Sequence, residues 1–219
     1  MAAERARHLA TLVSVVLAAC AALRGPVSPS LKVAAQQRDA LAISDALEEL
    51  IADGKDQPAD RQYAYDAVLS LDDDTAGSAY ARAAVTGRLV QQRGLLEANL
   101  IGDVESWGLR SRQLDPEFRG GAATRLLGTL YVIAPSSFLK HGDSEQGLEL
   151  LERLTSDHPD VPENHLRLAE AYIALGDRAP AAPHLCASLE KRSALRRDEQ
   201  TLLDQLVSVT GAPDCVAQH

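Results

Sequence analysis

The sequence of 219 residues contains few aromatic side chains. It has one tryptophan, two phenylalanines and five tyrosines, which together make up 4% of the chain. Aromatic residues are enriched in strands, whereas alanine and leucine, which dominate here, are strong helix formers. The composition therefore argues against a β-rich fold and favours helices, in a chain long enough for one domain or a short repeat array.

Clusters of basic residues are also missing. The formal net charge is −9 at pH 7, and no stretch of lysine and arginine is dense enough to follow a phosphate backbone. Nucleic-acid binding is disfavoured, because it depends on neutralising phosphates. The same charge opposes broad contact with anionic lipid head groups. Any membrane attachment would have to come from an anchor.

Long apolar runs are absent except near the N-terminus. Residues 9–19 are apolar apart from two hydroxyl side chains, and Arg5 and Arg7 precede them. A bilayer span needs about 20 residues, so a permanent transmembrane helix is disfavoured. A positive start, a short apolar core and a small-residue exit are typical of an export signal. The sequence therefore predicts a signal peptide over residues 1–19.

The end of this run, Leu17-Ala18-Ala19-Cys20, resembles a bacterial lipobox. The resemblance implies that Cys20 is lipidated on sulfur and becomes the first residue of an exported chain. Residues 20–32, with Gly25 and two prolines, are then expected to form the anchor and a tether. The body would lie in the periplasm, and Ala21 favours the outer membrane over the inner. An ordinary cleaved signal, or an apolar start that arose by chance, is the alternative.

Two further cysteines, Cys186 and Cys215, would remain in the exported chain. Exported proteins form disulfides because their compartment is oxidising, so these two are a candidate disulfide. An unstrained bridge over this separation would stabilise the fold by about 3–4 kcal/mol. The chain after a C-terminal helix would have to return towards Cys186. Two free thiols are the alternative.

Apolar residues recur at helical spacing along most of the chain, and almost no stretch alternates as a strand would. A first stripe ends before Gly54, which is a helix stop signal. Trp107 lies on the stripe of a later helix, and we expect it in the core rather than stacked on a ligand. The first stripe consists of Ile43, Leu47, Leu50 and Ile51, and further helices are expected near residues 64–71, 78–92 and 95–113.

The second half of the chain repeats itself. Residues of one helix reappear 41 positions later, and those of the next helix reappear 34 positions later. The first unit therefore carries seven extra residues, which fall within residues 133–142. Small residues occupy the positions where two helices of a pair must approach closely. The matching sets include Thr124, Leu127, Gly128 and Tyr131 with His165, Leu168, Ala169 and Tyr172, and Gly147, Leu151 and Leu154 with Ala181, Leu185 and Ser188.

This pattern resembles the tetratricopeptide repeat, a helix–turn–helix unit of about 34 residues. The likeness is clearest over residues 119–161 and 162–192, and residues 193–210 are expected to form a capping helix. Upstream of residue 76 the likeness depends on helix pairing alone. The resemblance implies an all-α, tetratricopeptide-like superhelix over residues 33–219, with about four helix pairs plus a C-terminal capping helix.

A narrower resemblance depends on five short segments. They are Leu114-Asp115-Pro116-Glu117-Phe118-Arg119-Gly120, Arg125-Leu126-Leu127-Gly128-Thr129-Leu130-Tyr131, Ala134-Pro135, His141-Gly142-Asp143 and His158-Pro159-Asp160, followed by Asn164. Together with the insertion they resemble the T-component family of TRAP transporters, which are periplasmic helical-repeat lipoproteins. The resemblance covers about half of the chain and implies that the partner is a solute-binding protein of a TRAP-type importer. A similar layout occurs in repeat lipoproteins without a known role.

No arrangement of residues typical of catalysis is present. Residues 136–137 are serines, but they lack a nucleophile elbow, and the sequence places no histidine beside them. His141, Asp143 and Glu145 lie close together and suggest a metal site. Asp143 or Ser144 is better interpreted as the N-cap of a helix that begins there. We therefore predict a non-enzymatic protein without a metal ion or cofactor.

The expected functional surface is the concave side of the superhelix, which is lined by the first helix of each pair. Six residues of these first helices, which lie next to the packing stripe on the helix surface, are expected to contact a partner segment. Among them, Arg125 would hold a carboxylate through two hydrogen bonds. The insertion within residues 133–142 is either a lid over this face or a plain longer turn. The six residues are Arg125, Thr129, Val132, Leu166, Glu170 and Ile173.

Three functions are compatible with the sequence. The first is a lipid-anchored periplasmic scaffold that docks another protein and reaches the membrane through its anchor alone. The second is a small-molecule-binding lipoprotein that uses the concave groove or an inner channel. The third is a scaffold for envelope assembly. The sequence leaves open whether the protein forms oligomers.

Overall fold

The chain folds into helices throughout the part that the structure describes. The computed structural model describes residues 25–211 and 215, and no strand occurs among them. The predicted all-α class is confirmed. The described α-helices are α2 (Pro29–Gln36), α3 (Ala40–Ala52), α4 (Pro58–Leu69), α5 (Ala76–Arg93), α6 (Ile101–Leu114), α7 (Ala122–Ile133), α8 (Ser144–Asp157), α9 (Pro162–Ala174), α10 (Ala181–Glu190) and α11 (Arg197–Thr210), with short 3₁₀ helices η1 (Gly94–Leu100), η2 (Ser136–Phe138) and η3 (Arg192–Ala194).

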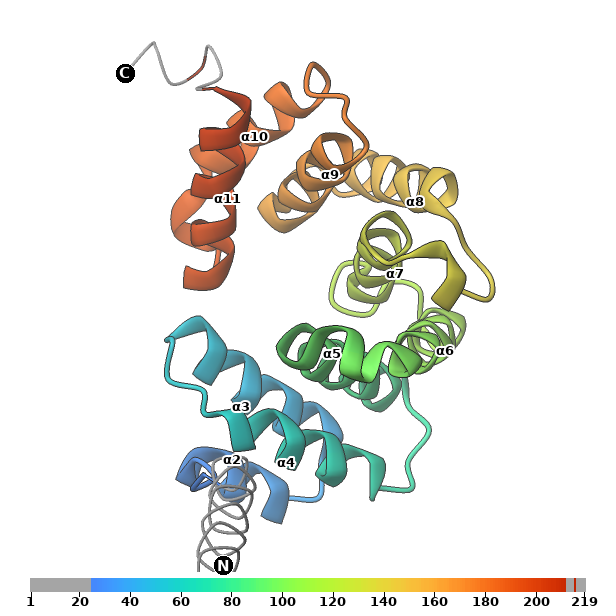
Figure 1. The fold of residues 1–219 in the computed structure, drawn as a ribbon, viewed down its shortest axis with the longest axis vertical. Coiled ribbons are helices and arrows are strands. Elements are labelled where there is room, and N and C mark those ends of the chain that lie inside the picture. Colours follow the sequence, from blue (N-terminus) through green and yellow to red (C-terminus); the bar gives the residue numbers. More distant parts are fainter. Residues whose placement is uncertain (1–24, 212–214, 216–219) are drawn as a thin grey trace, which may run out of the picture.

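The helices form pairs that follow one another in a curved array (Figure 1). α3 packs with α4, α5 with α6, α7 with α8 and α9 with α10, and neighbouring pairs are in contact. α11 packs on the last pair as a cap. The predicted superhelix of four pairs and a cap is therefore confirmed, with α2 added before the first pair. The array curves far enough to bring α11 into contact with α3.

Side-chain caps define where several helices begin. Asp39 accepts a hydrogen bond of 2.8 Å from a backbone N–H in the first turn of α3. Thr75 does the same for α5, at 3.1 Å. Asp143 caps α8 with a hydrogen bond of 2.9 Å, as predicted. Each cap satisfies at least one of the N–H groups that have no partner within the helix.

The helix α2 begins inside the segment that we expected to be a tether, residues 20–32. Leu31 is fully buried. Ser28 donates two hydrogen bonds of 2.7 Å to Asp60, one from its N–H and one from its hydroxyl. The tether prediction is therefore wrong for residues 29–32, because Leu31 completes the apolar core of the first pair.

The predicted signal peptide, residues 1–19, and the predicted lipidation site, Cys20, lie outside the described residues. Of the helices that the structure does describe, none is both long and apolar enough to cross a membrane. The anchor therefore stays a prediction.

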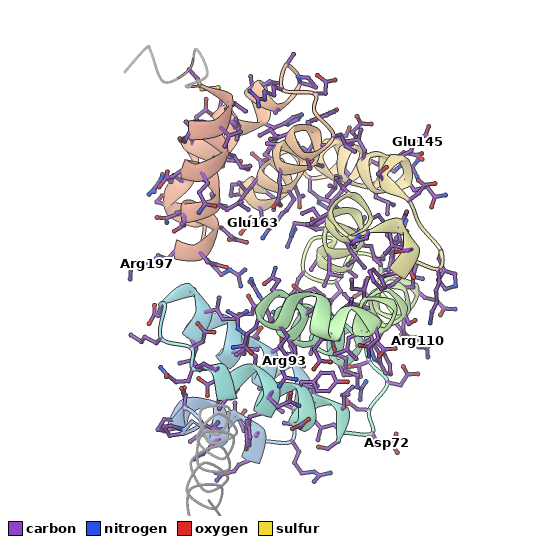
Figure 2. The ribbon with its side chains drawn as sticks, in the orientation of Figure 1. Asp72, Arg93, Arg110, Glu145, Glu163 and Arg197 are labelled. Atoms are coloured by element: carbon purple, nitrogen blue, oxygen red, sulfur yellow. A yellow bond between two sulfur atoms is a disulfide. The ribbon has the colours of Figure 1, made fainter. Side chains whose placement is uncertain are left out.

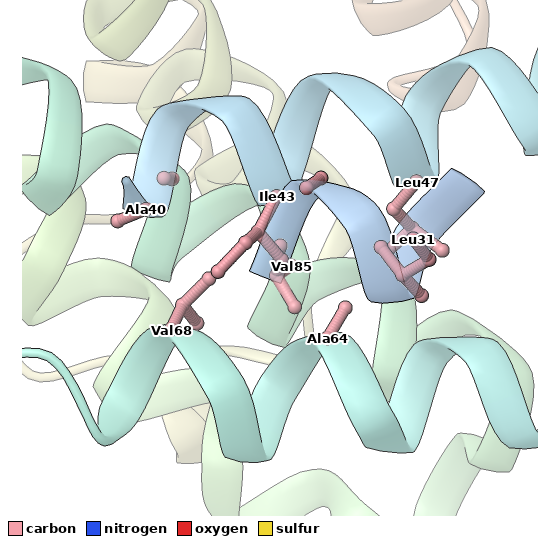
Figure 3. Close-up of a cluster of buried hydrophobic side chains, with 9 residues drawn as sticks. Leu31, Ala40, Ile43, Leu47, Ala64, Val68 and Val85 are labelled. Carbon is pink, nitrogen blue, oxygen red and sulfur yellow. The ribbon is translucent and has the colours of Figure 1, made fainter. Parts of the chain in front are cut away.

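An apolar core holds the N-terminal part together (Figure 3). Side chains from α2, α3, α4 and α5 meet in one buried cluster. Ile43 and Leu47, which the sequence places on one stripe, are 1% and 0% exposed. Burying a side chain of this size contributes about 1.5–3 kcal/mol. The labelled members of the cluster are Leu31, Ala40, Ile43, Leu47, Ala64, Val68 and Val85.

Trp107 is half-buried on α6 and packs against a cation of the protein itself. The guanidinium carbon of Arg82 lies 4.8 Å from the centre of the indole ring. Arg82 is 4% exposed and donates hydrogen bonds to the carbonyl oxygens of Leu71 (2.7 Å) and Asp73 (2.8 Å). The single tryptophan thus helps to fix the loop between α4 and α5.

Two glycines allow α7 and α8 to pack closely. A Cβ atom on Gly128 would lie 2.7 Å from the side chain of Leu151, and one on Gly147 would lie 2.8 Å from the carbonyl oxygen of Gly128. Ordinary contacts between carbon atoms are about 3.5–4.0 Å long. The predicted close approach at small residues is therefore confirmed for this pair. The equivalent alanines of the next pair, Ala169 and Ala181, are fully buried.

The disulfide in the structure joins Cys186 to Cys215, whose Cα atoms are 5.9 Å apart. Cys186 lies on α10, and Cys215 follows the end of α11. The bridge therefore ties the end of the cap to the last helix pair. It adds to the apolar contacts that Leu203 and Leu206 of α11 make with α9 and α10.

Replacing Gly128 by alanine tests the packing of α7 on α8. We expect Gly128→Ala to lower the free energy of unfolding by about 1–3 kcal/mol, because the new methyl group must displace Leu151 or the α8 backbone. Urea unfolding followed by circular dichroism measures the change.

Gly87→Ala is the matched control on α5. Its Cβ would lie 3.9 Å from Val104, which is a normal contact. An alanine in this helix should raise the free energy of unfolding by about 0.5–1 kcal/mol. Similar effects of Gly128→Ala and Gly87→Ala would contradict the close approach.

Candidate functional site

The inner face of the array is formed by the first helix of each pair. In Figure 1, α3, α5, α7 and α9 lie nearer the centre of the curve than α4, α6 and α8. Figure 2 shows Arg110 of α6 and Glu145 of α8 on the outer rim. A partner that binds on the concave side of such an array meets the first helices.

Arg125 reaches from α7 to α9. Its Nη1 donates to Oδ1 of Asn164 at 2.7 Å, and Asn164 is fully buried. The guanidinium is half-buried, and this is its one hydrogen bond to the residues that the structure describes. An arginine has five N–H donors. Arg125 therefore links two repeats and keeps donors for a carboxylate.

The prediction that Leu166 contacts a partner is wrong. Its side chain is fully buried in the cluster that joins α9 and α10 to α11, with Leu185 and Leu203. Leu166 occupies the position on α9 that Arg125 occupies on α7. A side chain at this position points to the next helix in the array, so Leu166 packs against the cap.

Val132 and Ile173 are half-buried for the same reason. Val132 packs against the cluster of Leu151 and Leu168. Ile173 packs against the cluster around Leu203. Both side chains contribute to the contact between successive helices of the array, and neither is a free contact residue.

Thr129 and Glu170 are the two predicted contact residues that stay on the inner face. They hold equivalent positions on α7 and α9, four residues after Arg125 and Leu166. Four residues turn a side chain by about 40° on a helix, which directs it away from the next pair. Both side chains are half-buried; Thr129 donates to the carbonyl oxygen of Arg125, and Glu170 accepts from Arg167, each at 2.8 Å.

Side chains outside the six predicted contact residues connect α3, α5 and the loop before α7. The rings of Tyr80 and Phe118 have their centres 5.7 Å apart. Arg119 lies over Phe118 at 5.6 Å and donates two hydrogen bonds of 2.7 Å to Asp45. Burial raises the pKa of Tyr80, so its hydroxyl is neutral at physiological pH. Asp45 and Arg119 are 74 residues apart, and only the curvature of the array brings them together.

A groove of about 280 Å³ lies over α9, between α8 and α10. The Nδ1 atoms of His165 and His184 are 2.9 Å apart, and Nε2 of His165 is 2.9 Å from the carbonyl oxygen of Pro159. Because a carbonyl only accepts, we assign the Nε2 proton to His165, so that Nδ1 of His184 donates. Burial, followed by the influence of His165, lowers the pKa of His184.

These two histidines satisfy each other and therefore belong to the packing of α9 and α10. In the part of the chain that the structure covers, no group of three or more histidine, cysteine, aspartate or glutamate side chains is arranged to hold a metal ion. The lining of the groove is completed by Glu152, Thr155, Ser156, Leu168 and Tyr172.

Helices α8 and α9, with the first part of α10, contain the residues that match a known repeat. The sequence model of the tetratricopeptide repeat matches residues 138–186. This part of the chain is similar to a tetratricopeptide repeat. The match begins in the insertion and ends on α10, within the region where the sequence repeats itself most clearly. No curated protein matches the chain. A tetratricopeptide repeat indicates a scaffold for protein–protein interaction.

Glu105 of α6 holds the insertion that leads into the tetratricopeptide repeat. Its side chain is fully buried and accepts hydrogen bonds of 2.8 Å from the backbone N–H groups of Lys140 and His141. Gly142 packs directly on the ring of Tyr131, where a Cβ would overlap. The insertion is therefore a fixed turn against α6 and α7, and Figure 1 shows it on the outer side of the array rather than over the inner face.

The ionisation of Glu105 links this turn to pH. Burial opposes the charge most strongly, but the backbone N–H groups of Lys140 and His141, with Tyr131, outweigh it and lower the pKa of Glu105. A carboxyl with a lowered folded-state pKa stabilises the fold above its unfolded-state pKa. That stability is lost as the pH falls through the folded-state pKa.

Glu105→Gln tests this contribution. We expect the substitution to lower the free energy of unfolding at pH 7 by about 1–3 kcal/mol, because two charge-assisted hydrogen bonds are lost. The loss of stability below pH 4.5, the ordinary pKa of the group, should become shallower. Urea unfolding across pH 3–7 measures both effects.

Glu149→Gln is the control for this prediction, because Glu149 pairs with Arg153 on an exposed surface. It should change the free energy of unfolding by less than about 0.5 kcal/mol. If Glu105→Gln has no larger effect than Glu149→Gln, the carboxylate does not anchor the turn.

Proposed function

We propose that this protein is a lipid-anchored docking scaffold of the bacterial periplasm, without enzymatic activity. Its partner is another periplasmic protein, the solute-binding protein of a TRAP-type transporter. The tetratricopeptide repeat over residues 138–186 supports the docking role. The predicted signal peptide over residues 1–19, followed by Cys20, supports the location, and the resemblance of the short segments between residues 114 and 164 to the T-component family supports the partner.

The docking role depends on one observation, the incomplete pairing of Arg125 beside the inner face. Arg119 and Arg167 each pair with a carboxylate of the protein itself. Arg125 donates to the amide oxygen of Asn164 and forms no ion pair with the described residues. A guanidinium binds a carboxylate through two parallel hydrogen bonds. An acidic side chain of the partner would therefore complete the pairing of Arg125.

Crosslinking in cells, followed by affinity purification and mass spectrometry, tests the docking role. A C-terminal tag keeps Cys20 free. We expect one periplasmic solute-binding protein to be enriched. Its recovery should fall by about tenfold or more with Arg125→Glu, because truncating a buried charge pair at an interface costs about 2 kcal/mol or more.

Two further variants separate binding from folding. Arg178→Glu makes the same change of charge at an exposed turn and should leave the recovery unchanged. Thr129→Arg adds a bulky side chain to the inner face while Arg125 keeps its bond to Asn164, and it should also reduce the recovery. Circular dichroism checks that all three variants are folded. Recovery of envelope-assembly proteins alone, or of nothing above background, would contradict the transporter partner.

The anchor is tested through Cys20. In detergent phase partitioning we expect the parent protein to enter the detergent phase and Cys20→Ala to stay in the aqueous phase, because the acyl chains supply the membrane affinity. The described body contains no membrane-spanning helix that could replace them. A Cys20→Ala variant that still enters the detergent phase would show that the lipobox interpretation is wrong.

A further inference from the structure

The two ends of the array meet through charged side chains. Figure 1 shows one end of α11 facing α3, and Figure 2 places Arg197 at that end. Arg88 of α5 donates to Glu48 of α3 from Nε at 2.7 Å and from Nη2 at 2.5 Å. Arg196, just before α11, donates from Nη1 to the same carboxylate at 2.6 Å. Glu48 is thus held by one arginine from its own end and by one that lies 148 residues away.

Asp198 adds a second carboxylate from the C-terminal end. Its Oδ2 accepts a hydrogen bond of 3.2 Å from Nη2 of Arg88. Its Oδ1 is buried without a hydrogen-bond partner among the described residues, and Nε of Arg196 lies 3.7 Å away. A buried carboxylate oxygen without a donor costs free energy. The contact that holds the ends together therefore also contains an oxygen whose hydrogen bonding is incomplete in the closed arrangement.

Apolar packing holds each end together but does not bridge them. The buried cluster around Leu47 draws its members from α2, α3, α4 and α5. The cluster around Leu203 draws its members from α9, α10, α11 and the loop before α11. In the described chain, neither cluster contains a side chain from the opposite end. We call the space between the two ends, α3 and α5 on one side and α11 on the other, the gap. The contact across the gap can therefore open without exposing either core.

We propose that Glu48, Arg88, Arg196 and Asp198 form a latch that closes the array into a ring and opens it reversibly. In the closed state, the latch restricts access to the inner face. The contact consists of polar side chains that water can solvate once it opens, and a ligand that binds one of the two states better shifts the population towards that state. The identity of the partner that binds the open array rests on the proposed docking function, whereas the opening of the latch does not.

Zero-length crosslinking tests whether the latch opens. Arg196→Lys keeps the charge and supplies an amine that a carbodiimide can join to Glu48. The same chain contains an internal control, because Lys191 lies 2.8 Å from Asp160 without spanning the gap. Crosslinked peptides are quantified by mass spectrometry at about 0.1 M and about 1 M sodium chloride, between which the Debye length falls from about 10 Å to about 3 Å.

The exposed fractions make this comparison decisive. Lys191 and Asp160 are 42% and 96% exposed, whereas Glu48 is 17% exposed. Screening alone should therefore reduce the control crosslink more than the crosslink across the gap, which joins Glu48 to the new amine at position 196. If the latch opens, the ratio of the yield across the gap to the control yield should fall by at least about threefold at high salt. A ratio that stays constant or rises would overturn the proposal.

Arg88→Gln gives a second test by small-angle X-ray scattering. The substitution removes the side chain that holds both Glu48 and Asp198. We expect the radius of gyration of the variant at low salt to increase to the value that the parent protein reaches at high salt. Arg178→Glu, at an exposed turn remote from the gap, should leave it unchanged.

Folding and docking are controlled separately in this test. Circular dichroism checks that Arg88→Gln retains its helices. A folded Arg88→Gln variant with the parent's radius of gyration at both salt concentrations would overturn the latch. Neither measurement uses a partner, so a failed latch leaves the docking proposal standing, and a failed pull-down leaves the latch standing.

Discussion

The apolar face of one helix pair has to be buried against the next pair, and the rest of the structure depends on this constraint. Gly128 and Gly147 let α7 and α8 meet closely enough to bury the face between them. The side of this pair that faces α9 is buried by a separate contact. There Val132 of α7 packs against the cluster that contains Leu168 of α9. An array of this kind is stable only as a stack, and its last pair needs a cap. Helix α11 supplies the cap, and the disulfide of the structure holds its end to α10.

The same constraint explains which side chains remain for binding. A side chain that faces the next helix is used for packing, as Leu166 shows. The equivalent position on α7 holds a polar side chain, Arg125, because the neighbouring helix offers it a polar partner, Asn164. A shift by four residues, to Thr129 or Glu170, moves the side chain to the inner face. Fewer side chains of the first helices are therefore available on the inner face than the sequence predicted, and the predicted contact residues that remain there are polar.

Charge has a different role from apolar burial in this array. Most of its ion pairs are partly exposed, and such pairs contribute about 0–1 kcal/mol each. They therefore add little stability, and they link distant elements that the curvature of the array brings together. Asp45 and Arg119 connect α3 to the loop before α7, and Glu48 connects α3 to Arg196 beside α11. The packing of successive pairs curves the array, and these contacts form where the curvature brings α3 close to the other two elements.

The sequence by itself determined the helical class, an array of about four helix pairs, a helix cap at Asp143 or Ser144, and the small residues where α7 crosses α8. All of these depend on neighbours within one or two helices, so periodicity and spacing reveal them. Only the tertiary structure decided that Leu166 is buried, that Glu105 anchors the insertion and that Glu48 meets Arg196. Each of these depends on how successive pairs rotate against one another, and that rotation is a sum of packing contacts over the whole array. No local pattern encodes it, because the residues that it brings together are up to 148 positions apart.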